Sequence, residues 1–147
     1  MKIKENERVN ILKTSNKYTN CVEDHIDVLN ENGTVWMARI GRDVDSQPIV
    51  NKNNYLFLYE RGKLFIAHYS DVTKVKPTYG YPSSYNKYIF GGTLIPAEYL
   101  LLDMIKEIDN HILDKLKYEG NQRIVSDTIG RSPKAYVVTL PIEEIDI

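Results

Sequence analysis

Aromatic and basic side chains gather in one stretch of the chain that lacks acids. Residues 72–97 contain no Asp or Glu, although the 147-residue chain has 20 acidic residues. The stretch supplies three lysines and four tyrosines, which are Lys74, Lys76, Lys87, Tyr79, Tyr81, Tyr85 and Tyr88. Tyrosine rings stack on bases and are enriched in protein interfaces, and lysines attract phosphates and acidic surfaces. Because Pro, Gly and Ser interrupt residues 77–92, we expect a loop that contacts a ligand or partner.

Three further candidates lie on apolar runs that are typical of strands. Trp36, Tyr59 and His68 each have a planar side chain that can contact a planar ligand. For Trp36 and His68 the alternative interpretation is a packed core residue, since both types are often buried. Arg39 is expected to face solvent. Arg42, in the polar loop that follows, is expected to reach a phosphate or carboxylate.

Catalytic and metal-binding patterns are weak. A hydrolase or nuclease would use His68 with Ser70 or Asp71, but no Gly-x-Ser-x-Gly elbow surrounds the serine. His25 and His111 have no second histidine three or four residues away, and there is no Cys-x-x-Cys pair. Glycine-rich phosphate-binding motifs are also absent from the sequence. We therefore assign no catalytic residue, metal or cofactor, and expect a binding protein more than an enzyme.

Five short apolar runs predict β-strands. They are residues 8–13, 34–40, 55–60, 63–69 and 135–140. The runs at 55–60 and 63–69 flank Arg61 and Gly62, which predicts a tight antiparallel hairpin with a positive φ at the glycine. The second arm can extend to Val75.

Two helices are expected, at residues 21–32 and 96–118. The first carries an apolar stripe and is followed by Gly33, and the second begins at Pro96 and is followed by Gly120. Helices are few and the hairpin is antiparallel, so the fold class is α+β. We expect a small, strongly curved antiparallel sheet or pseudobarrel with these two helices on its surface.

Length and composition indicate one ordinary globular domain over residues 1–147. The chain is long enough to bury a core, its formal net charge is −1, and its single cysteine, Cys21, cannot form an internal disulfide. No apolar run is long enough to cross a bilayer. We therefore expect a cytoplasmic protein with no membrane partner.

Residues 33–75 resemble a known superfamily. The order Gly33-Thr-Val-Trp36, Tyr55-Leu-Phe-Leu-Tyr59-Glu, a tight turn and Lys63-Leu-Phe-Ile-Ala-His68-Tyr-Ser-Asp-Val72 is similar to the PUA-like superfamily, which includes the ASCH, EVE and YTH-type domains. The resemblance implies a pseudobarrel with an aromatic-lined cleft that accepts a flipped or modified base, or a nucleotide. It also implies that Trp36, Tyr59 and His68 line that cleft.

Two functions from different classes follow as expectations. The first is a small binding module for nucleic acid, a modified base or a nucleotide, in which Arg42, Lys74, Lys76 and the tyrosines of residues 79–88 contact the backbone or sugar. The alternative is a protein-interaction or inhibitor protein, such as a phage or bacterial accessory factor, that acts through its tyrosine-rich surface. A composition rich in Lys, Asn and Ile suits an AT-rich phage or bacterial genome.

Overall fold

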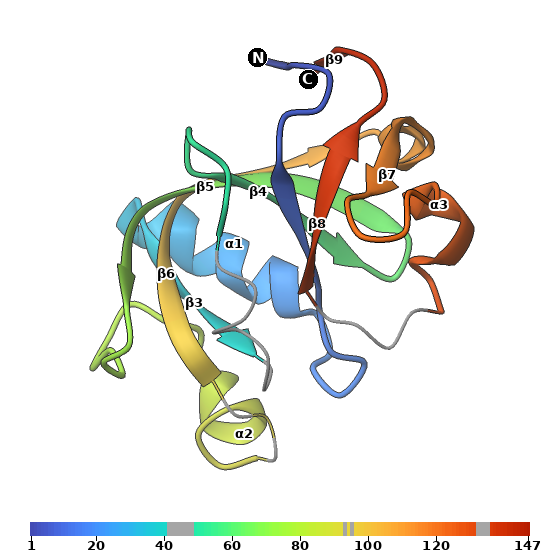
Figure 1. The fold of residues 1–147 in the computed structure, drawn as a ribbon. Helices are drawn as coiled ribbons and strands as arrows, with labels where there is room; N and C mark the ends of the chain where they lie inside the picture. The colour runs from blue at the N-terminus through green and yellow to red at the C-terminus, as the bar shows by residue number, and fades with distance from the viewer. Residues whose placement is uncertain (41–48, 93, 95, 132–135) are drawn as a thin grey trace.

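A seven-stranded mixed sheet forms the body of the protein. The computed structural model describes residues 1–40, 49–92, 94, 96–131 and 136–147. The strand order is β3, β6, β5, β4, β2, β8, β7. The strands are β2 (Val9–Lys13), β3 (Val35–Ile40), β4 (Tyr55–Glu60), β5 (Lys63–Thr73), β6 (Pro96–Ile108), β7 (Leu116–Tyr118) and β8 (Tyr136–Pro141). A separate ribbon of β1 (Lys2–Ile3) and β9 (Ile145–Asp146) brings the termini together (Figure 1).

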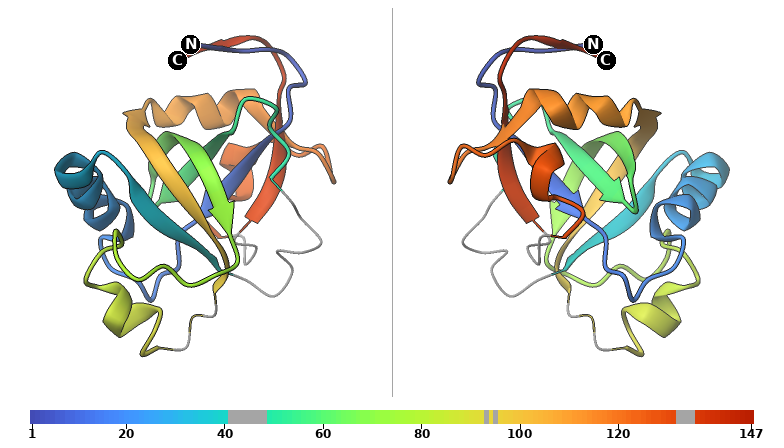
Figure 2. Two further views of the ribbon diagram at one scale, coloured as in Figure 1. Left: turned by 90° about the vertical axis from the view of Figure 1, so that its left-hand side faces the viewer. Right: turned by 90° about the vertical axis from the view of Figure 1, so that its right-hand side faces the viewer.

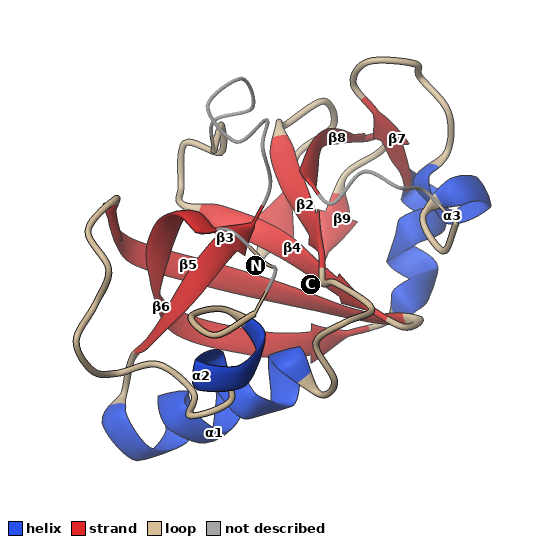
Figure 3. Ribbon diagram, turned by 90° about the horizontal axis from the view of Figure 1, so that it is seen from below, coloured by secondary structure: helices blue, strands red, loops and turns tan. Residues whose placement is uncertain are grey.

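Short helices cover the two ends of this sheet. The helices are α1 (Cys21–Asn32), α2 (Tyr85–Tyr88), the 3-10 helix η2 (Asn110–Lys115) and α3 (Val125–Thr128). Helices α1 and α2 lie together at one end of the sheet, and α3 lies at the other (Figure 3). Among the described residues, no helix is both long and apolar enough to span a membrane.

The predicted helix at residues 21–32 and the predicted hairpin are confirmed. Helix α1 ends at Gly33, whose φ is +79° and whose N–H donates to the Leu29 carbonyl at 2.8 Å. Strands β4 and β5 flank Arg61 and Gly62, with φ values of 48° and 86°, as a tight hairpin turn requires. Strand β5 continues to Thr73.

Strand β4 also supplies the acceptor for the start of α1. The Glu60 carboxylate accepts hydrogen bonds from the backbone N–H groups of Cys21 at 2.9 Å and Val22 at 3.2 Å. These groups have no acceptor within the helix, and a negative charge near a helix N-terminus is favourable. The contact joins α1 to the central hairpin.

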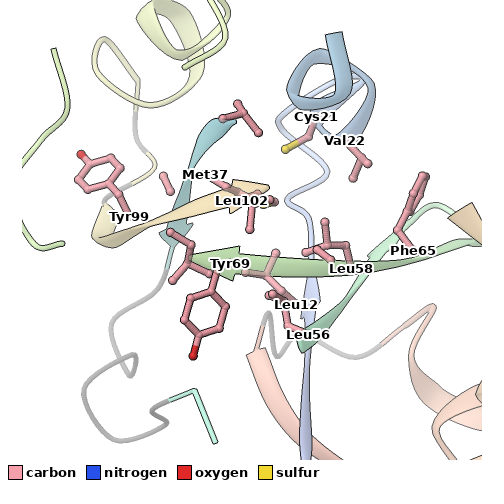
Figure 4. Close-up of a cluster of buried hydrophobic side chains, with 14 of the residues drawn as sticks. Leu12, Cys21, Val22, Met37, Leu56, Leu58, Phe65, Tyr69, Tyr99 and Leu102 are labelled. Carbon is pink, nitrogen blue, oxygen red and sulfur yellow. The ribbon is translucent and has the colours of Figure 1, made fainter. Parts of the chain in front are cut away.

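Two apolar clusters lie on opposite faces of the central strands. Leu58 of β4 and Phe65 of β5 belong to one cluster, with Val22 of α1, whereas Phe57 and Leu64 belong to the other. The membership alternates along each strand because successive side chains point to opposite faces. Figure 4 shows side chains of the first cluster, among them Leu12, Met37, Leu58 and Leu102.

The predicted helix at residues 96–118 is wrong. The segment instead forms strand β6, the six-residue helix η2 and strand β7. A run rich in Leu and Ile satisfies the periodicity of a helix and that of a buried strand equally. Pairing decides the outcome, because β6 is an interior strand that pairs with β3 on one side and β5 on the other.

The sheet is neither wholly antiparallel nor closed into a barrel. Strand β2 pairs in parallel with β4, with Ile11 opposite Phe57. This pairing is possible because α1 and β3 supply the long crossover between the two strands. The sheet is strongly curved in both views of Figure 2, but β3 and β7 remain its ends. The expected pseudobarrel is therefore corrected to an open, curved, mixed sheet.

Candidate functional site

Trp36 is half-buried beside the loop that precedes α2. Its backbone N–H donates to the Gly80 carbonyl at 2.8 Å. A Cβ added at Gly80 would lie 3.4 Å from Cδ1 of the Trp36 indole ring. Gly80 has a φ of +79°, a conformation that other residues rarely adopt. The loop backbone therefore packs against the ring that was expected to stack on a ligand. Arg42, which was expected to reach a phosphate or carboxylate, lies outside the described residues.

The structure does not bring the three expected cleft residues together. Trp36 packs against the first apolar cluster, whereas Tyr59 is buried in the second. His68 lies half-buried on β5, where its ring meets Tyr55 edge-on with centroids 5.0 Å apart. These side chains therefore do not line one aromatic cleft.

Three of the four loop tyrosines pack inward. The Tyr85 side chain is 1% exposed, and Tyr81 stacks on it with ring centroids 5.7 Å apart. Tyr88 stacks on Tyr18 at 4.5 Å. The Tyr18 hydroxyl in turn bonds the Ser84 hydroxyl, so the loop is fixed to the chain before α1. In this arrangement Tyr81, Tyr85 and Tyr88 stabilise the loop.

The same loop covers the outer edge of the sheet. Strand β3 is the first strand in the order, so the backbone groups on its outer side have no strand partner among the described residues. The Ala38 N–H donates to the Tyr85 hydroxyl at 2.7 Å, and the Trp36 N–H donates to Gly80. Covering an edge in this way prevents it from pairing with another chain.

A buried histidine completes this contact. His25 Nδ1 lies 2.5 Å from the Cys21 carbonyl and Nε2 lies 2.6 Å from the Tyr85 hydroxyl. The carbonyl can only accept, so Nδ1 carries the proton and Nε2 accepts from Tyr85. Burial lowers the pKa of His25 to about 4, and it raises the pKa of the Cys21 thiol. Both groups are therefore neutral at pH 7 and serve packing.

The exposed large apolar side chains of the acid-free stretch lie near its beginning. We call residues 71–79 the projecting segment; it contains Val72, Val75 and Tyr79, which are 41%, 74% and 80% exposed. Lys74 and Lys76 are exposed between them. The segment comprises the last residues of β5 and the chain that follows them, at the lower left of Figure 1. Among the described residues, the other exposed large hydrophobic residues are Met1 and Ile142.

The expectation that Arg39 faces solvent is wrong, because its side chain is buried. Its side chain is 2% exposed, its Nε lies 2.7 Å from a Glu98 carboxylate oxygen, and its guanidinium lies 4.3 Å from the ring centroid of Tyr136. Strand alternation places it on the same face as Val35 and Met37, which are also buried. The contact with Tyr136 links β3 to β8 across the curved sheet.

His68 pairs with the carboxylate of Asp103 at a point where the pairing of β5 with β6 is irregular. Its Nδ1 lies 2.7 Å from Asp103 Oδ1, and the register of β5 against β6 shifts between His68 and Tyr69. Ser70 instead donates to the Leu101 carbonyl at 3.5 Å. No hydrogen bond joins His68 to Ser70 or Asp71 in the described chain, so the expected hydrolase arrangement is not formed there.

A hollow lined mostly by charged and polar residues lies elsewhere on the surface. Its volume is about 600 Å³, and its lining residues are Lys4, Glu5, Asn6, Glu7, Arg8, Val50, Lys52 and Asn53. No aromatic ring is among them. Arg8 is held by Glu119 through hydrogen bonds from Nε at 2.5 Å and Nη2 at 2.8 Å. Over residues 1–40, 49–92, 94, 96–131 and 136–147, no group of three His, Cys, Asp or Glu residues could hold a metal ion.

Comparison with known proteins identifies no family or homologue for this chain. No family model matches the chain, and no curated protein or solved structure matches it. The resemblance to the PUA-like superfamily stays a prediction.

Proposed function

We propose that this protein is a protein-interaction module that docks onto a partner through its projecting segment. The observation that carries the proposal is the clustering of exposed apolar side chains. Val72, Val75 and Tyr79 are three of the five exposed large hydrophobic residues in the described chain, and they lie within eight residues of one another. Clusters of this kind mark interaction sites, whereas isolated exposed apolar residues are ordinary.

The chemistry of the segment favours a protein partner over a base. Stacking on nucleic acid needs exposed rings, but Tyr59 and Tyr85 are buried, and Tyr81 and Tyr88 are half-buried against other rings. The remaining exposed apolar groups include two valines, which gain free energy from burial against another apolar surface, at about 25 cal/mol per Å². An interface with an apolar centre and a charged rim has this composition.

The base of the segment is well anchored, which favours binding. Residues 71–73 pair with β6, and Lys76 Nζ lies 4.0 Å from the Phe90 ring centroid. Gly80, just beyond the segment, is held by Trp36. A surface that is ordered before binding loses less conformational freedom when the partner arrives.

Capture of partners from a lysate of the native host tests the proposal. The immobilised protein is compared with the double variant Val75→Ser/Tyr79→Ser, and Ile142→Ser is the matched control because Ile142 is 41% exposed elsewhere. We expect the double variant to lose a stoichiometric protein that the control retains. If all three capture the same proteins, the projecting segment is not the contact surface.

Nucleic-acid binding is the second candidate because three lysines are exposed in a stretch without acids. Lys74, Lys76 and Lys87 would contact phosphates, and the exposed ring of Tyr79 would stack on a base. Few phosphate contacts predict a shallow dependence of affinity on salt. Titration with single-stranded RNA and DNA at two ionic strengths tests this candidate, and the absence of binding at low salt rejects it.

A further inference from the structure

The last part of β5 has one open edge. Strand β4 pairs with β5 only as far as Tyr55 opposite His68, whereas β5 continues against β6 to Thr73. Just beyond His68, the Tyr69 N–H donates to the Asn54 carbonyl at 3.1 Å. In the described part of the chain, no strand pairs with β5 on this side after that point (Figure 1).

Local side-chain contacts occupy the backbone donors at this edge. The Val72 N–H donates to the Asp71 carboxylate at 2.8 Å, and the Val75 N–H donates to the Thr73 hydroxyl at 3.1 Å. Alternate residues of an antiparallel strand direct their N–H and C=O groups to opposite sides. Because the N–H of Val72 bonds a side chain and not β6, Val72 presents its backbone groups to the open edge. A new strand can replace such short, solvent-exposed contacts.

The charge around the edge limits what can pair there. Lys74 and Lys76 are exposed directly beyond the strand, close in sequence to the exposed Val72 and Val75. Lysines at an exposed strand edge discourage pairing of the protein with itself. The same lysines attract an acidic chain, and the valines offer it apolar contacts.

From these observations we propose that the open edge of β5 over residues 70–73 accepts an extended, acidic segment of a partner protein as an added β-strand. The inference rests on the proposed function and specifies its mode. Hydrogen bonds between backbones give the affinity, while Val72, Val75 and the two lysines select a segment in which acidic and apolar residues alternate.

Binding of a synthetic peptide tests this inference. The probe is fluorescein-labelled Asp-Val-Glu-Ile-Asp-Val with blocked ends, and its affinity is measured by fluorescence anisotropy. Val72→Pro removes the open-edge N–H, which β6 does not use, and proline is tolerated at strand edges. Val72→Thr keeps the N–H and the branched shape as the matched control. We expect Val72→Pro to weaken binding at least about tenfold and Val72→Thr to change it less than about twofold.

A gain of affinity gives a sharper test than a loss. Asp71→Ala removes the carboxylate that occupies the Val72 N–H and repels an acidic peptide. We expect this variant to bind the probe about two to five times more tightly than the wild type, the size of one exposed charge contact. A probe in which every backbone nitrogen is methylated should not bind, because neither of its edges can donate, and this measurement needs no variant of the protein.

Several results would overturn strand addition. The first is that the wild type does not bind the peptide at about 1 mM. The second is that Val72→Pro and Val72→Thr bind the probe equally well, and the third is that Asp71→Ala binds it more weakly than the wild type. The fourth is that the wild type binds the methylated probe as well as the unmethylated one. Single-stranded RNA that competes with the probe and still binds Val72→Pro would assign the surface to nucleic acid instead. If Val75→Ser/Tyr79→Ser loses a captured protein that Val72→Pro retains, strand addition fails while the proposed function stands. If neither variant loses it, both fail.

Discussion

Replacing Tyr85 by phenylalanine removes one oxygen from the most connected buried contact of the loop. That hydroxyl accepts from the Ala38 N–H at 2.7 Å and donates to His25 Nε2, 2.6 Å away. The ring itself would stay in place, with its stacking against Tyr81. The variant therefore isolates the hydrogen bonds from the packing.

The structure gives the expected magnitude. Tyr85→Phe leaves a buried donor and a buried acceptor without partners, and each unsatisfied group costs about 1–3 kcal/mol. A loss of about 3 kcal/mol in the free energy of unfolding is a large part of the 5–15 kcal/mol typical of a domain. For a chain of this size it lowers the melting temperature by about 6–12 °C.

Urea unfolding followed by circular dichroism and by fluorescence measures this loss. Trp36 is the only tryptophan, and because it contacts Gly80 its emission reports on the position of the loop. Tyr79→Phe is the control, since that ring is 80% exposed and the change should stay within about 0.5 kcal/mol. If Tyr85→Phe is as stable as the control, the loop is not anchored by this hydroxyl and our account of the β3 edge is wrong.

Three further predictions test other parts of the fold. Burial lowers the pKa of His25 to about 4 in the folded protein, against about 6.5 in the unfolded chain, so the free energy of unfolding should fall by up to about 1.4 kcal/mol per pH unit between pH 6 and 4. His25→Gln should lessen this slope in urea titrations at several pH values, and an unchanged slope would contradict the prediction. Arg39→Met should lower the free energy of unfolding by about 3 kcal/mol, because the half-buried Glu98 loses the partner of its carboxylate and the buried stacking on Tyr136 is lost. Arg39→Met/Glu98→Met should regain much of that loss. Glu60→Gln should cost about 1 kcal/mol in calorimetry by weakening the contacts at the start of α1, and no change would remove that role.

Local signals predicted the parts of the fold that are determined locally. The hairpin around Gly62 and the helix that ends at Gly33 each have a glycine with positive φ at the required place. The segment 96–118 lacks such a decisive signal, because its Leu and Ile residues fit a helix or a buried strand. Its pairing with β3 and β5 joins residues at least 26 positions apart, which no short window of sequence can reveal.

The candidate site was only partly predictable for the same reason. The acid-free stretch with its lysines and tyrosines pointed to the projecting segment, which is exposed. Burial of Tyr85 depends on His25, 60 residues earlier in the chain. Arg39 was misplaced because alternation assigns residues to two faces but does not say which face is buried. The aromatic content therefore suggested a larger binding surface than the structure leaves exposed.

Site-specific photo-crosslinking in the native host tests the central claim most directly. A photoreactive amino acid is placed at position 75 in the projecting segment and, as the reference, at position 142. We predict a discrete cross-linked protein from position 75 that position 142 does not give. The claim that the protein binds its partner through the projecting segment would be contradicted if both positions gave the same cross-links. It would also be contradicted if position 75 gave no cross-link to any protein.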